Sequence, residues 1–169
     1  DGFGEGNLRA SRQLGRVALS ALMAASVAVA AVQAEGSEQC GAMPCRSNGA
    51  PYVTDKGAIV IFPGEQFVIA FKIENGKIVD AEPYPAGGQL SNAIEVNFKK
   101  VDSGMMLTLA NHLPKKVKYD AIMKAPDNKL VYTSSCPIDA GLSSFEHWPH
   151  PIKFLALVNF RFHDGGRCE

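Results

Sequence analysis

Apolar and polar residues alternate along three segments of the chain after residue 58. Because successive side chains of a strand point to opposite faces of a sheet, this period of two predicts strands with one buried face. None of the three segments shows the spacing of an amphipathic helix. The residues expected on the buried faces are Phe67, Ile69, Phe71 and Ile73, then Ile94, Val96 and Phe98, then Val117, Tyr119, Ala121 and Met123.

The last strand and the turns complete this pattern. Asn75-Gly76 is expected to form the tight turn of a hairpin, because both residues tolerate a positive φ. Polar, Gly- and Pro-containing residues at 102–104 and 125–128 predict two further turns. Residues 152–163 are expected to form one long strand, with six apolar residues on one face: Ile152, Phe154, Ala156, Val158, Phe160 and Phe162.

About seven to nine short strands separated by turns predict an all-β, antiparallel β-sandwich. The segment "ANHLPKKVKYDAIM", residues 110–123, resembles a strand pair of bacterial immunoglobulin-like sandwiches. In that pair an Asn-x-x-Pro turn leads into a lysine-rich strand that bears a tyrosine, as it does in this segment. The resemblance implies an immunoglobulin-like sandwich in an exported bacterial protein, and it carries over no functional residue.

The first 34 residues have the organisation of a secretory signal peptide. Basic residues precede an uncharged, alanine-rich run from residue 17 to residue 34. Small residues at the end of this run predict a signal helix that is cleaved after Ala34. An uncleaved membrane anchor is the alternative, although a spanning helix needs about 20 apolar residues. We therefore expect a signal peptide at 1–34, an irregular N-terminal arm at 35–57 and the sandwich domain at 58–169.

The charge of the chain argues against two classes of partner. The whole chain has 17 basic and 17 acidic residues, and removal of 1–34 leaves 14 basic and 15 acidic residues, a net charge of −1. A nearly neutral chain has no electrostatic attraction for nucleic acid or for an anionic membrane. We expect neither as a partner of the mature protein.

All four cysteines, Cys40, Cys45, Cys136 and Cys168, follow the predicted signal peptide. An even number of cysteines in an exported protein predicts disulfides, because the compartment is oxidising. Three pairings are possible, and we expect Cys40–Cys45 and Cys136–Cys168. A zinc site or a redox dithiol is the alternative, although structural zinc usually binds closely spaced pairs of ligands. The cysteines and the signal peptide together predict a periplasmic or secreted bacterial protein.

Residues 145–154, "FEHWPHPIKF", combine two histidines, a carboxylate and the only tryptophan. Pro149 and Pro151 disfavour a helix and hold the segment extended, so the two histidines are kept apart rather than directed at one metal ion. We expect a stiff loop at 137–151 that presents a contact surface to a partner. The candidate contact residues are Glu146, His147, Trp148 and His150.

These observations predict an exported, non-catalytic binding or interaction module without a cofactor. Its partner would be an unknown protein or small ligand in the periplasm, and the oligomeric state is left open. One alternative is a copper or zinc binder that uses His112, His147 and His163 together with methionines. Another is a small hydrolase in which Glu146 acts with a second carboxylate, as paired carboxylates do in glycosidases. The sequence contains no nucleotide-binding, calcium-binding or serine-hydrolase motif.

Overall fold

The computed structural model describes residues 37–40, 43–46, 52–84, 89–166 and 168, which all lie in one compact unit spanning residues 31–169. All the secondary-structure elements that these residues form are strands, and none of the residues belongs to a helix that could cross a membrane. The predicted signal peptide at 1–34 lies outside the described residues. The strands are β1 (Ser37–Cys40), β2 (Met43–Arg46), β3 (Ile59–Ile61), β4 (Glu65–Glu74), β5 (Lys77–Pro83), β6 (Ala93–Val101), β7 (Gly104–Asn111), β8 (Val117–Lys124), β9 (Leu130–Thr133), β10 (Ser143–Trp148) and β11 (Phe154–Phe162).

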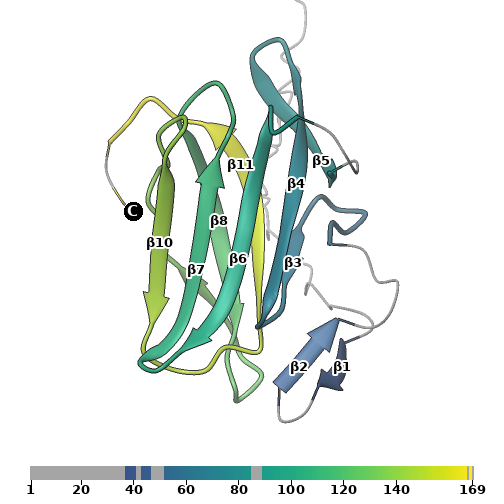
Figure 1. Cartoon of the computed structure of the whole chain (residues 1–169), viewed down its shortest axis with the longest axis vertical. Coiled ribbons are helices and arrows are strands. Elements are labelled where there is room, and N and C mark those ends of the chain that lie inside the picture. Colours follow the sequence, from purple (N-terminus) through teal and green to yellow (C-terminus); the bar gives the residue numbers. More distant parts are fainter. Residues whose placement is uncertain (1–36, 41–42, 47–51, 85–88, 167, 169) are drawn as a thin grey trace, which may run out of the picture. The chain divides into compact units, whose positions relative to one another are not determined.

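Nine of these strands form two antiparallel sheets that pack against each other (Figure 1). The five-stranded sheet has the order β10-β7-β6-β4-β5, and the four-stranded sheet has the order β3-β11-β8-β9. The chain crosses between the sheets after β3, after β7, and on both sides of β10. β1 and β2 pair as a separate hairpin within the stretch that was expected to be irregular. The predicted all-β, antiparallel sandwich is therefore confirmed at the level of its two sheets.

One apolar cluster between the sheets forms the main core, and every residue that the alternation predicts on the buried faces of β4, β6 and β8 belongs to it or packs against it. Aromatic side chains join the two layers at its centre. The ring of Phe160 on β11 lies 4.9 Å from that of Phe71 on β4 and 5.5 Å from that of Tyr119 on β8, between ring centroids. Burial of such side chains away from water is the main favourable contribution to folding.

Two of the predicted turns depend on backbone conformations that few residues adopt. Asn75 and Gly76 have φ angles of 50° and 72° and join β4 to β5 as a two-residue hairpin turn. Gly104 begins β7 with a φ of 142° after the turn from β6. The turn residues read from the sequence are thus the ones that the structure uses.

The prediction for the last strand is wrong in one respect. A β-bulge interrupts the pairing of β11 with β8 between Val158 and Arg161, where Asn159 has a φ of 54°. The extra residue reverses the alternation, because a strand that gains one residue presents the opposite side chains from that point. Leu155 and Leu157 therefore face the main core before the bulge. Phe160 faces it after the bulge, while Phe154, Ala156 and Val158 belong to a second cluster on the other face of the sheet.

The expectation of a loop over 137–151 is also wrong for residues 143–148, which form β10. This strand lies at one edge of the five-stranded sheet and pairs with β7, with Phe145 opposite Thr108 and His147 opposite Met106. The expectation of a stiff loop rested on Pro149 and Pro151, but both prolines lie just outside the strand, which is itself rich in polar residues. An edge position tolerates this composition because only one side of the strand must pair.

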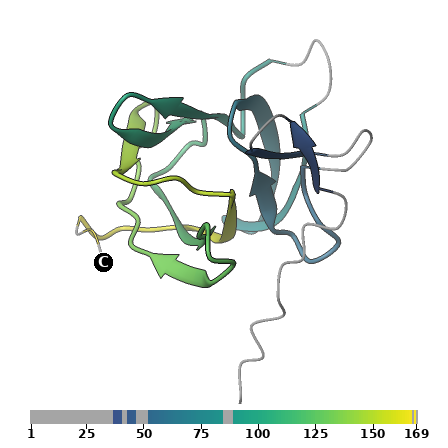
Figure 2. The same ribbon diagram turned by 90° about the horizontal axis from the view of Figure 1, so that it is seen from below.

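The predicted disulfide between Cys136 and Cys168 is present. It connects the segment after β9 to the end of the chain, and Figure 2 shows the yellow C-terminal segment on the side of the molecule where β9 and β10 lie. Lys116 Nζ also donates a hydrogen bond to the carbonyl of Gly165 at 3.3 Å. Cys45 is disulfide-bonded as well, whereas the side chain of Cys40, its predicted partner, lies outside the part that is described.

Candidate functional site

The strand geometry of β10 divides the predicted contact residues into two groups. Glu146 and Trp148 face the space between the sheets, and Trp148 is 7% exposed. Phe145 and His147 face outward from the five-stranded sheet, and Phe145 is 70% exposed. His150 follows the strand and is exposed. The structure therefore places His147 and His150 at the surface, leaves Glu146 partly buried, and places Trp148 in the core.

Trp148 has a structural role in the main core. Its ring meets that of Phe98 edge-on, with centroids 6.4 Å apart and an interplanar angle of 84°. Its indole Nε1–H donates to Thr133 Oγ1 at 3.2 Å, so the polar end of the ring has a partner. The buried ring and this hydrogen bond anchor β10 to the end of β9.

Glu146 lies within a small polar cluster between the edges of the two sheets. Its Oε1 accepts hydrogen bonds from Tyr119 Oη at 3.1 Å and from the backbone N–H of Cys136 at 3.3 Å. Burial raises the pKa of the Glu146 carboxyl, against the opposing effect of these two bonds. Burial and the charge of Glu146 in turn raise the pKa of Tyr119. Among the described residues, no second carboxylate is hydrogen-bonded to Glu146.

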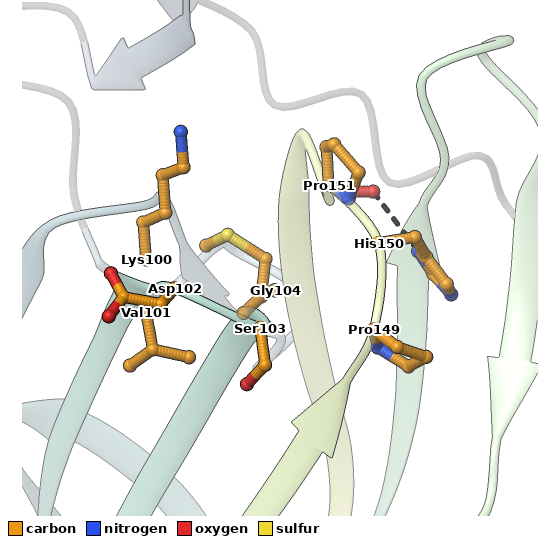
Figure 3. A pocket seen from close by; sticks show the side chains of 9 residues that line it. Lys100, Val101, Asp102, Ser103, Gly104, Pro149, His150 and Pro151 are labelled. Atoms are coloured by element: carbon orange, nitrogen blue, oxygen red, sulfur yellow. Dashed lines mark hydrogen bonds between the residues drawn. The ribbon is translucent and has the colours of Figure 1, made fainter.

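A pocket of about 300 Å³ lies where the turn between β6 and β7 meets the segment after β10 (Figure 3). The two walls come close together at Gly104, where a Cβ atom would collide with the backbone of Trp148 and Pro149. In Figure 3 the His150 ring extends from its loop away from the turn, and its Nδ1 lies 3.2 Å from the carbonyl of Pro151. The lining residues are Lys100, Val101, Asp102, Ser103, Gly104, Met105, Pro149, His150 and Pro151.

Ser103 and His147 meet at the rim of this pocket, with 2.9 Å between Ser103 Oγ and His147 Nε2. A serine next to a histidine is also the first half of a nucleophile-and-base arrangement. That arrangement requires a third group to orient the histidine, and no carboxylate among the described residues bonds to His147. The pair is exposed, so its hydroxyl and imidazole groups are available to a partner as hydrogen-bonding groups.

The histidines of the metal-binding alternative have separate surroundings. His112 Nε2 lies 2.7 Å from Glu95 Oε1, His147 contacts Ser103, and His163 follows β11 beside Gly165. Among the residues that the structure describes, no group of three or more His, Cys, Asp or Glu side chains could hold a metal ion.

Sequence reasoning missed two parts of this surface, namely Phe145 and the residues of the β6–β7 turn. Phe145 and His147 are two residues apart, so a strand over this segment would have placed both side chains on the same face. The approach of Ser103 to His147 joins residues that are far apart in the sequence, and no local signal predicts it. Comparison of the chain with protein-family models, with curated proteins and with solved structures finds no match.

Proposed function

We propose that this chain is an exported, non-catalytic binding or interaction module built on an immunoglobulin-like sandwich. Its contact surface, called the β10 surface below, consists of Phe145, His147, Ser103 and the pocket beside them. The observation that carries the proposal is the pocket of about 300 Å³ at the end of β10. One lining residue, Ser103, contacts the exposed His147, and His147 shares the outward face of β10 with the exposed ring of Phe145. A concave site with a few convergent polar groups is the usual form of a binding site.

The rigidity of the pocket walls supports binding over catalysis. Two prolines flank His150, and Trp148 anchors the preceding strand in the core. A preorganised surface loses little conformational entropy when a partner binds, which favours affinity. The walls combine apolar groups with Lys100, Asp102, Ser103 and His150. A suitable partner would place an apolar group in the pocket and a hydrogen-bond acceptor against Ser103 or Lys100.

The disulfides support the proposed periplasmic or secreted location. Cys136–Cys168 is formed and Cys45 is disulfide-bonded, and such bonds persist in oxidising compartments. The immunoglobulin-like assignment is supported by the two antiparallel sheets and the crossings between them, together with the resemblance of residues 110–123. A protein of this kind would meet its partner, a protein or a small ligand, outside the cytoplasm.

A capture experiment tests the β10 surface against the rest of the molecule. The full chain is immobilised, incubated with bacterial periplasmic extract, and the retained molecules are quantified by mass spectrometry. We expect His147→Ala and His150→Ala to lose a species that the wild-type protein retains. His112→Ala and His163→Ala, which change two histidines elsewhere, should retain it. Identical capture by all five proteins would show that the β10 surface is not the binding surface.

A further inference from the structure

The outer edge of β10 is an unpaired row of backbone groups. Within the described residues, β10 pairs only with β7, and no other segment bonds to the backbone of 143–148. The carbonyl of Leu142, just before the strand, accepts the N–H of Asn111 on β7 at 2.9 Å. Because these groups alternate in direction along a strand, the N–H and C=O of Ser143, Phe145 and His147 point to the unpaired edge.

The two edges of the five-stranded sheet differ in how they are protected. The opposite edge, β5, carries Lys77, Asp80, Glu82 and Pro83, and its pairing with β4 includes a register shift. Charges, proline and bulges are the devices that keep edge strands from pairing with other chains. β10 has one charged residue, Glu146, whose carboxylate is turned inward and bonded to Tyr119 and Cys136. β10 is therefore the edge of this sheet that is open to a further strand.

The side chains of this segment add an apolar contact to the open edge. Phe145, at the middle of β10, is 70% exposed, and Leu142, just before the strand, is 58% exposed. Phe145 is the most exposed large hydrophobic residue in the described part of the chain. An aromatic ring at the centre of an edge strand can pair with an aromatic ring on an adjacent strand, which stabilises a sheet.

We propose that β10 pairs antiparallel with β10 of a second copy of this chain, about a two-fold axis at Phe145. In one continuous sheet, residues that lie directly opposite each other on neighbouring strands direct their side chains to the same face of the sheet. Centring on Phe145 places the two Phe145 rings together and Ser143 opposite His147 of the second copy. Centring on Glu146 would instead place two carboxylates opposite each other, and like charges in that position destabilise a sheet.

This register uses every edge-directed group of β10. The backbone N–H and C=O groups of Phe145 bond to those of Phe145 in the second copy. Those of each Ser143 bond to those of His147 in the other copy, so all three residues are in hydrogen-bonded pairs. The same patch serves both chains, as a two-fold interface requires. The two five-stranded sheets become one continuous sheet, and the two β10 surfaces lie side by side on it. The dimer does not depend on the proposed binding function.

The oligomeric state of the full chain is measured by sedimentation velocity over a wide range of concentrations. We expect a reversible monomer–dimer equilibrium that Phe145→Lys weakens at least tenfold, because two lysines would meet at the axis. Val79→Lys is the matched control, since Val79 is a 51% exposed residue on the opposite edge strand. A wild-type protein that is monomeric at every concentration would overturn the proposal, and so would a dimer that Phe145→Lys leaves intact.

Cysteine cross-linking tests the register itself. Directly opposite residues of a hydrogen-bonded pair have Cα atoms about 5.5 Å apart, within the range that a disulfide spans. We therefore expect Phe145→Cys to form an intermolecular disulfide in a glutathione buffer. Ser143→Cys should not, because its two copies would lie about 13 Å apart at the rise of a strand. Equal cross-linking of the two variants would overturn the proposed register.

Discussion

Removal of the Cys136–Cys168 disulfide is a direct test of how this domain is stabilised. The double variant Cys136→Ser, Cys168→Ser leaves no unpaired thiol at the site. The backbone N–H of Cys136, which donates to Glu146, is unchanged by the substitution. The main effect should therefore be on the unfolded chain, which gains the freedom that the cross-link had removed.

The size of the effect follows from the length of the loop. The two cysteines are separated by 32 residues in the sequence. The loop-entropy relation gives about 3.7 kcal/mol at 25 °C for a loop of this length. A domain of this size has a total free energy of unfolding of about 5–15 kcal/mol. The disulfide should thus account for a large fraction of the stability of the domain.

Urea unfolding, followed by tryptophan fluorescence and analysed by linear extrapolation, measures this difference. The signal comes from Trp148, which is buried in the main core. A control variant, Cys40→Ser with Cys45→Ser, should lose less stability, because the predicted bridge closes a much shorter loop. A loss below about 1 kcal/mol in the Cys136, Cys168 variant would refute the loop-entropy reasoning.

Four further substitutions, one of them a matched control, test other features of the structure. Gly104→Ala should lower the free energy of unfolding by more than about 3 kcal/mol, because the added methyl group collides with the Trp148 backbone at a φ of 142°. Gly64→Ala is the matched control, because Gly64 has a φ of 90° but open space around it, and it should lower the free energy of unfolding by only about 1–2 kcal/mol. Equal losses for the two variants in urea unfolding would contradict the role of the collision. Glu146→Gln removes a carboxyl whose pKa burial raises, so the wild type binds more protons when folded than when unfolded. The free energy of unfolding of the wild type should therefore fall, relative to that of the variant, as the pH rises from the ordinary pKa of a Glu carboxyl through the raised pKa of Glu146. Thermal unfolding across this pH range measures the difference, and the opposite trend would refute this reasoning. Thr133→Val leaves the Trp148 Nε1–H without its partner and should cost about 1–3 kcal/mol, seen as a lower Tm; an unchanged Tm would count against the anchoring role.

The candidate site shows where prediction from sequence ends. The sequence singled out the segment around Trp148, and the structure does place a pocket and two exposed histidines at its end. It could not show which side chains face outward, because that depends on the pairing of β10 with β7. The burial of Trp148 depends on Phe98 and Thr133, which lie far away in the chain. These distant residues, and not the segment around Trp148, decide that its ring lies in the core.

The sequence by itself determined the local features whose cause is local. Alternation with a period of two assigned the buried faces of β4, β6 and β8, because the strand backbone alternates in the same way. Asn75 and Gly76 specified their turn through the φ angles that they tolerate. Tertiary structure decided the features that need two distant segments. The bulge at Asn159 arises in the pairing of β11 with β8, and it reverses which aromatic residues reach the core. The open edge of β10 likewise exists only because the sheet ends there, and sheet order is set by packing of the whole domain rather than by any one segment.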